Sequence, residues 1–254
     1  MQTTFTIYIP GKNRCDSASA LQNSLKALDP ELPYSQMMRI RASGNAAREC
    51  TDIYYLCTDG ENNLVSRLWM GWGKHERAVG NWGNFFTCPE YRGQGIGRQM
   101  LSFWQNDLKT RQNLPLALFC TAGEEGLAKL YAPYGFRPAL KNTTCGPLYC
   151  PLGNSPESFA EFCEQYYTLA SSLTFKPATL EWRHEIDCLF KFAMLSKGLD
   201  YLPKGMTSLE ASLLEKDTHI EIIFTDTNIP VGLAVLHENE KKDVRIYPSY
   251  AHLI

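Results

Sequence analysis

The sequence predicts an α/β (α+β) fold, in which helices flank both faces of a mixed, mostly antiparallel sheet and a smaller C-terminal α+β unit follows. Two apolar runs, 53–57 and 64–70, flank the turn-forming residues 59–63 and predict a β-hairpin. An apolar, aromatic run ending at Cys88 precedes a glycine-rich turn and an amphipathic stretch, which indicates a strand, a loop and a helix. The chain of 254 residues exceeds the roughly 150 residues of one ordinary domain, so a second unit is expected.

The remaining elements of the first unit follow from local patterns. Residues 4–10 indicate a strand, and residues 18–28 indicate a helix that an Asp-Pro pair ends. Residues 84–87 supply the strand before the glycine-rich turn, and 101–109 continue the helix after it. The continuous apolar run 116–120 is typical of a buried parallel strand.

The segment 89–98, Pro-Glu-Tyr-Arg-Gly-Gln-Gly-Ile-Gly-Arg, carries the strongest chemical signal. Its three glycines at alternate positions allow backbone conformations that a Cβ would forbid. Their N–H groups, with those of the first helical turn, are able to converge on one anion. Arg92 and Arg98 add positive charge at the two ends. The segment therefore predicts a phosphate-binding loop.

The glycine spacing distinguishes between kinds of phosphate-binding loop. A dinucleotide-binding loop needs glycine at the first, third and sixth positions, but the sixth position counted from Gly93 is Arg98. A Walker loop needs Gly-Lys-Ser/Thr, which the sequence lacks. The pattern Arg/Gln-x-x-Gly-x-Gly does fit residues 92–97. This segment resembles the acyl-coenzyme A pyrophosphate loop of the GNAT superfamily of N-acetyltransferases.

A second match follows at the distance that the GNAT superfamily has. Residues 126–136 end in Leu-Tyr-x-x-x-Gly-Phe, which is similar to the superfamily's second signature. Two positions depart from the pattern: Glu124 stands where an asparagine is common, and Leu127 stands where a small residue is usual. The resemblance covers roughly residues 50–150.

The resemblance implies an N-acetyltransferase that moves an acetyl group from acetyl-CoA, its cosubstrate, directly to a primary amine of a small molecule or peptide. Tyr131 matches the tyrosine that often acts as general acid toward the leaving thiolate, although a tyrosine that only packs on the cosubstrate is the alternative. Free backbone amides before the loop are expected to meet the pantetheine and the carbonyl oxygen. The expected cofactor-binding residues are Phe86, Thr87, Cys88, Arg92, Gly93, Gln94, Gly95, Ile96, Gly97 and Arg98.

The general base and the function class leave alternatives open. His75, Glu76 and Glu124 are candidate bases by location, and a water relay is the alternative to all three. A catalytically silent CoA-binding regulatory module would keep the same loop. A nucleotide-phosphate-binding protein is disfavoured because the lysine and Ser/Thr of a Walker loop are missing.

Cysteine and tryptophan positions suggest packing more than chemistry. The nine cysteines are dispersed without a C-x-x-C pair, so we expect buried free thiols and no metal site. Cys88 and Cys120 lie at the ends of the two strands expected beside the cofactor, but core packing is preferred to a nucleophilic role. Trp69, Trp72 and Trp82 would either form an aromatic wall of the acceptor groove or be buried in the sheet, and burial is preferred.

Charge and composition exclude several classes of protein. The net charge of −2 argues against a nucleic-acid partner, which usually leaves a basic protein face. No apolar stretch approaches the ~20 residues that cross a bilayer, and the N-terminus does not resemble a signal peptide. A cytoplasmic protein without membrane contact is expected.

The C-terminal residues repeat part of the same order, so we expect domains at 1–151 and 152–254. The predicted elements are helices at 156–171, 181–195 and 208–215 and strands at 173–179, 219–224, 231–236 and 243–247. This order resembles the first half of a GNAT domain and predicts a truncated second repeat that ends where a phosphate loop would begin, the alternative being an unrelated α+β unit. The open edge of its sheet should be covered by the N-terminal domain or by a second chain in a homodimer.

Overall fold

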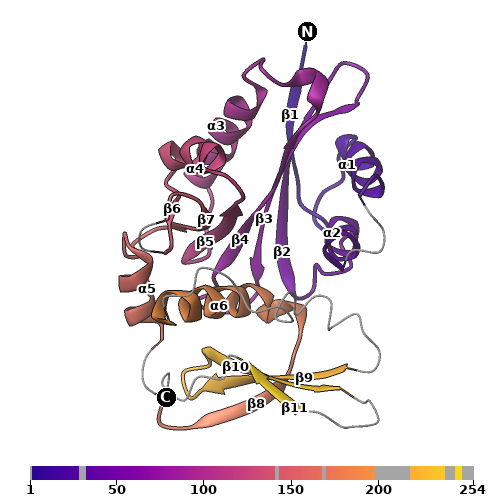
Figure 1. Ribbon diagram of the computed structural model, residues 1–254. Coiled ribbons are helices and arrows are strands. Elements are labelled where there is room, and N and C mark those ends of the chain that lie inside the picture. The colour runs from indigo at the N-terminus through magenta and orange to yellow at the C-terminus, as the bar shows by residue number, and fades with distance from the viewer. Residues whose placement is uncertain are drawn as a thin grey trace.

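Figure 1 shows the computed structural model, in which residues 2–28, 33–140, 143–167, 170–197, 218–237 and 244–247 are described. They form a seven-stranded sheet in the order β1-β2-β3-β4-β5-β7-β6 and a four-stranded sheet in the order β11-β10-β9-β8. Within these residues β4 and β5 run parallel, and the other neighbouring strands are antiparallel. The predicted fold class, a mixed and mostly antiparallel sheet with a smaller second sheet, is confirmed.

The strands of the first sheet are β1 (Thr4–Tyr8), β2 (Cys50–Thr58), β3 (Leu64–Gly73), β4 (Gly80–Thr87), β5 (Ala117–Ala122), β6 (Arg137–Pro138) and β7 (Gly146–Pro151). The helices of this part are α1 (Ser17–Lys26), α2 (Pro33–Ser43), α3 (Ile96–Leu108), α4 (Glu125–Tyr131) and α5 (Phe159–Tyr166), with 3-10 turns η1 (Pro89–Tyr91) and η2 (Ala132–Tyr134). The C-terminal elements are β8 (Leu173–Pro177), η3 (Leu180–Trp182), α6 (Arg183–Lys197), β9 (Thr218–Thr225), β10 (Pro230–His237) and β11 (Val244–Tyr247).

Helices cover both faces of the first sheet, as predicted. Successive side chains of a strand point to opposite faces. Tyr54 and Leu56 of β2 therefore pack in the cluster that contains α1 and α2, whereas Tyr55 and Cys57 pack in the cluster that contains α3. Figure 1 shows α1 and α2 on one side of β2 and β3, and α3 and α4 on the other.

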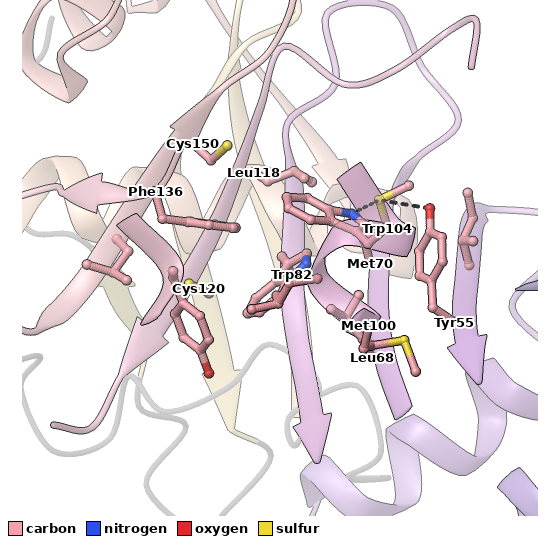
Figure 2. Close-up of a cluster of buried hydrophobic side chains, with 14 of the residues drawn as sticks. Tyr55, Leu68, Met70, Trp82, Met100, Trp104, Leu118, Cys120, Phe136 and Cys150 are labelled. Carbon is pink, nitrogen blue, oxygen red and sulfur yellow. Dashed lines mark hydrogen bonds between the residues drawn. The ribbon is translucent and has the colours of Figure 1, made fainter. Parts of the chain in front are cut away.

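The core between α3 and the sheet is aromatic. Figure 2 shows Trp82 of β4 and Trp104 of α3 beside Phe136, with ring centroids 4.9 to 5.8 Å apart. The indole Nε1 of Trp104 donates to Sδ of Met70 at 3.3 Å, so this buried donor has a partner. Burying a large apolar side chain contributes about 1.5–3 kcal/mol. This cluster therefore holds α3 firmly against β4, the strand that leads into the glycine-rich loop.

Most of the predicted elements are present, with some differences in extent. The hairpin of β2 and β3 and the parallel pair β4 and β5 are confirmed. Helix α2 and strands β6 and β7 were not predicted. The helix predicted at 156–171 is shorter, because it begins only after Ser158, whose hydroxyl accepts from the amide of Glu161 at 3.2 Å. The helix predicted at 208–215 lies outside the described residues.

The second sheet repeats the order of the first four strands. Strands β8, β9, β10 and β11 are neighbours in chain order and antiparallel throughout, as are β1, β2, β3 and β4. Helix α6 follows β8 as α1 follows β1. This order is what a partial repeat would have. Helix α5 packs on Phe119 and Tyr149 of the first sheet, however, so the boundary expected at 151/152 stays a prediction.

Helix α6 lies between the two sheets (Figure 1). Its Ile186 and Leu189 pack with strands of the second sheet, and its Cys188 packs with residues of β5 and α5. The backbone of Gly73 at the end of β3 lies against η3, because an added Cβ there would collide with the carbonyl oxygen of Glu181. The two parts of the chain are thus in direct contact.

We expect Gly73→Ala to reduce the free energy of unfolding by about 1–3 kcal/mol, because the new methyl group has no space against Glu181. Urea unfolding measures the change. Gly60→Ala, in the open turn between β2 and β3, is the matched control and should change stability by no more than about 0.5 kcal/mol. Equal unfolding midpoints for the two variants would contradict the close approach.

Candidate functional site

Strands β4 and β5 separate at the site. Their pairing consists of Gly80 with Leu118 and Asn81 with Phe119, and the described register ends there. The β3–β4 register shifts between Arg67 and Trp69, and Asn84 of β4 has a φ of 48°. A bulge of this kind bends a strand and redirects its side chains. The second half of β4 therefore has one edge paired with β3 and the other edge open toward α3 and α4.

The backbone of Thr87 faces that open edge. The amide of the next residue, Cys88, donates to the carbonyl oxygen of Val65 in β3 at 2.9 Å. Antiparallel neighbours alternate in direction, so Phe86 also faces β3 and Thr87 faces away. The predictions that the amides of Phe86 and Cys88 are free are therefore wrong. Of these three residues, only Thr87 has its backbone N–H and C=O groups directed away from β3. Its carbonyl oxygen accepts from Nε of Arg92 at 3.0 Å.

The loop after Cys88 is held in place by its own contacts. The hydroxyl of Tyr91 donates to Oδ2 of Asp59 in the β2–β3 turn at 3.1 Å, and Gln94 Nε2 donates to the carbonyl oxygen of Glu90 at 3.1 Å. Gly93 and Gly95 have φ values of 77° and 79°, a region that favours glycine. Gly95 is the residue before α3, so its conformation sets the direction in which the helix begins.

The first turn of α3 points its amides into a groove. The N–H groups of Ile96, Gly97 and Arg98 have no acceptor within the helix, because an α-helix leaves its first N–H groups unpaired. A Cβ added at Gly97 would lie 3.4 Å from Cζ of Phe85 and 3.8 Å from Oγ1 of Thr87, so this turn lies directly beside β4. The groove has a volume of about 600 Å³. It is lined by Phe85, Phe86, Thr87, Tyr91, Arg92, Gly93, Gly95, Ile96, Gly97, Arg98, Leu127, Leu130 and Tyr131.

Tyr131 lies at the inner end of this groove. The side chain is 5% exposed, and its ring packs edge-on against Trp82 with centroids 4.9 Å apart. Burial, with a smaller effect of Cys120, raises the pKa of Tyr131 to about 12. The phenol is therefore protonated throughout the neutral range. It has the protonation state that a proton donor needs.

A second pocket of about 480 Å³ opens beside the groove, and Phe85, Phe86, Leu127 and Tyr131 line both. Its other lining residues come from β3, β4 and β5 and from α6. They are Arg67, Trp69, Asn81, Trp82, Gly83, Asn84, Cys120, Thr121, Arg183, Asp187 and Lys191. Sequence reasoning missed the α6 residues of this wall. Their spacing of four along a predicted helix was the available signal.

The residues that the sequence suggested as bases lie elsewhere. His75 stacks on Trp182 at 3.9 Å and its Nε2 lies 3.0 Å from Oε1 of Glu185, so it belongs to the contact with α6. Glu76 and Glu124 are exposed, and none of the three lines the groove or the second pocket.

The tryptophans and cysteines are part of the core. Trp69, Trp72 and Trp82 are all at least nine-tenths buried, although Trp69 and Trp82 also line the second pocket. Burial raises the pKa of the Cys88 and Cys120 thiols, which disfavours the nucleophilic thiolate in both. All nine cysteines are free, and within the described ranges no three His, Cys, Asp or Glu side chains gather as metal ligands would. None of the helices described here combines the length and apolar character needed to span a membrane.

Residues 51–138 match the family described as the acetyltransferase (GNAT) domain. A putative GNAT acetyltransferase from Desulfovibrio desulfuricans is 14% identical, with 60% of this chain and 100% of that chain covered and a TM-score of 0.41. The ribosomal-protein-S18-alanine N-acetyltransferase from Escherichia coli is 17% identical, with 61% and 97% covered and a TM-score of 0.41.

A third structure is a GNAT family N-acetyltransferase from Escherichia coli in complex with CoA. It is 12% identical, with 61% of this chain and 84% of that chain covered and a TM-score of 0.41. No curated protein sequence matches the chain significantly.

Gly97 and Gly126 offer a matched test of the groove, because each is the second residue of a helix. Gly97→Leu should weaken the binding of CoA about tenfold, or about 1.4 kcal/mol, since its side chain would cover the amides of the first turn of α3. Gly126→Leu, whose Cβ has only Glu124 Oε1 within 4 Å, should bind CoA as the parent protein does. Calorimetry measures both affinities.

If Gly97→Leu is unstable, Gly97→Ala replaces it in the CoA-binding measurement. Alanine stabilises a helix by about 0.5–1 kcal/mol relative to glycine, so this variant is expected to fold. Parent-like CoA affinity in both Gly97 variants would refute this placement of the anion site.

Proposed function

Since residues 51–138 match the GNAT acetyltransferase domain family, we propose that this protein is an N-acetyltransferase that moves an acetyl group from acetyl-CoA directly to a primary amine. The observation that carries the proposal is the groove between the open edge of β4 and the first turn of α3, with Tyr131 at its inner end. An extended, anionic thioester fits such a groove, because its two ends offer different chemistry.

The outer end of the groove is suited to the pyrophosphate. The amides of the first turn of α3 and the positive helix terminus favour an anion by about 0.3–1 kcal/mol. Arg92 and Arg98 line the same end and add two positive charges. The Arg92 side chain is already oriented by its hydrogen bond to the Thr87 carbonyl oxygen. We assign residues 92–98 to pyrophosphate binding.

The inner end is suited to the thioester, because Tyr131 lies there. The amide of Thr87 faces away from β3 beside the first turn of α3, and in this proposal it donates to the pantetheine arm between the two ends. The acceptor nitrogen forms its bond to the acyl carbon, and the carbon–sulfur bond breaks. Tyr131 then gives its proton to the sulfur, and the surplus proton of the amine leaves to water. Solvent returns a proton to Tyr131.

We assign no protein side chain as general base. Asp187 is the carboxylate among the described residues that line the second pocket, and it is unsuited to this role. Burial would raise the pKa of Asp187, but the positive charges of Lys191 and Arg183 outweigh burial and hold it below its ordinary value. A carboxylate stabilised in this way is a weak base at neutral pH.

We also propose that the chain comprises a catalytic unit, residues 1–151, and a half-sized unit, residues 152–254, that repeats its first four strands. The support is the shared strand order and direction of the two sheets. In this proposal the second unit serves the acceptor side of the site through α6.

Acetyl-CoA turnover over a panel of primary amines, measured as released CoA thiol, tests the function. Thiol release with matching N-acetylated product is the expected result. Binding of acetyl-CoA without turnover on any amine would support the silent regulatory module instead. Failure to bind acetyl-CoA in calorimetry would overturn both.

Tyr131→Phe should lower kcat by about 10²–10⁴-fold and leave the affinity for acetyl-CoA unchanged, because the hydroxyl acts only as the thiolate leaves. Tyr134→Phe is the control, since Tyr134 donates to the carbonyl oxygen of Arg98 outside the groove and should affect kcat little. Steady-state kinetics on the best amine of the panel gives kcat, and calorimetry gives the affinity. Full activity in Tyr131→Phe would remove the residue from the mechanism.

A further inference from the structure

A third cavity lies at the opposite end of β5 from the proposed transfer site. Its volume of about 510 Å³ is within the range of ordinary small-molecule sites. Pro115 and Leu116, directly before β5, line this cavity, whereas Cys120 and Thr121 near the other end of β5 line the second pocket. Among the described residues, none that lines this cavity also lines the groove or the second pocket. The cavity is therefore a separate site.

Segments that are distant in the sequence build this cavity. One wall is formed by Phe162, Gln165 and Tyr166 of α5, so we name the space the α5 cavity. The other walls include residues 114–116 before β5 and 152–156 after β7. Leucine, proline and aromatic side chains make up most of this lining. Such a lining is suited to an apolar part of a ligand.

Hydrogen bonds tie these segments together. The carbonyl oxygen of Leu116 accepts from the amide of Leu152 at 3.0 Å and from Oγ of Ser155 at 2.7 Å. The amide of Leu116 donates to the carbonyl oxygen of Ala78 at 2.8 Å, which fixes the segment that carries Arg77. The α5 cavity is therefore preformed, as small-molecule sites usually are.

Arg77 supplies the charge of the α5 cavity. It is the one cation among the described lining residues, none of which is Asp or Glu. Its φ of 57° is in the left-handed region, which a residue with a Cβ rarely adopts and which is common at ligand sites. The guanidinium Cζ lies 5.4 Å from the centroid of the Tyr166 ring. Within the part of the chain that the structure describes, the guanidinium has no carboxylate partner and no hydrogen bond.

Tyr166 adds a second donor beside Arg77. The residue is 3% exposed, and a buried phenol usually has a hydrogen-bond partner. Its hydroxyl has none among the described residues, and it is accessible, whereas that of Tyr167 is fully enclosed. Burial, with Glu185 and Cys188, raises the pKa of Tyr166 well above its ordinary value, although Arg77 acts in the opposite direction. The phenol therefore stays protonated and is able to donate.

We propose that the α5 cavity binds a small organic carboxylate with an apolar or aromatic body. The guanidinium of Arg77 pairs with the carboxylate, whose planar shape it matches, and the hydroxyl of Tyr166 donates to the same group. The apolar body lies against Leu152, Pro156 and Phe162. A phosphate dianion is less suited, because the described lining offers it a single cation. This site does not depend on the proposed acetyl transfer.

Matched ligands test the proposal by calorimetry on the full chain, without any turnover. The series contains benzoate, 3-phenylpropionate and 4-phenylbutyrate, each with its carboxamide, and acetate. The best carboxylate should bind at least about tenfold more tightly than its carboxamide and than acetate, which lacks the apolar body. Saturating CoA should leave this affinity unchanged, because the α5 cavity and the groove are separate. Equal affinities within every pair, or competition with CoA, would overturn the proposal.

Variants locate the binding. Arg77→Gln should remove the preference for the carboxylate over its carboxamide and leave the affinity for the carboxamide unchanged, and Arg77→Lys should restore part of the preference. Tyr166→Phe keeps the ring beneath Arg77 and should weaken carboxylate binding about threefold to tenfold, so it serves if Arg77→Gln is unstable. Arg48→Gln removes an exposed arginine outside the α5 cavity and is the control. An unchanged preference in both Arg77→Gln and Tyr166→Phe would refute this placement.

Discussion

Asn81 occupies the last position at which β4 and β5 are paired, and the candidate site depends on this point of divergence. Its backbone pairs with Phe119, while its side chain contacts the Phe119 carbonyl oxygen at 3.4 Å and Asp187 at 2.6 Å. Beyond it the two strands separate. If they had stayed paired, the outward amide of Thr87 would be used in the sheet, and side chains of adjacent strands would fill the space of the groove and the pocket.

The position of α6 depends on buried polar contacts with the segment between β3 and β4. Oε1 of Glu185 accepts from the amide of Val79 at 2.8 Å and lies 3.0 Å from Nε2 of His75. Burial raises the pKa of Glu185, although His75 and the Val79 amide act in the opposite direction. Buried polar groups are costly without partners. When α6 packs so that Glu185 keeps its contacts with Val79 and His75, the helix face that carries Arg183, Asp187 and Lys191 lies along the second pocket.

Elements with a clear local pattern could be predicted from the sequence. Elements in which a buried charge or glycines interrupt the apolar pattern could not. The hairpin and the loop before α3 follow from turn residues and alternation. Helix α2 was not predicted, because its Arg41 is buried in an ion pair with Asp52 at 3.0 Å. A charged residue on the buried face interrupts the apolar stripe by which an amphipathic helix is identified in a sequence. Strand β4 begins earlier than predicted because Gly80 and Gly83 lack the side chains typical of strands.

The sequence by itself determined the glycine-rich turn before α3 and the segment that carries Tyr131, because glycine conformations, the start of α3 and the Leu-Tyr-x-x-x-Gly-Phe segment are properties of neighbouring residues. The tertiary structure decided which backbone faces the groove, since the amide of Cys88 is taken by Val65 and only the strand register reveals it. It also decided which side chains line the second pocket. Asn81 and Asp187 are 106 residues apart, and a contact over that separation forms only when α6 packs against β4, so it leaves no pattern in the local sequence.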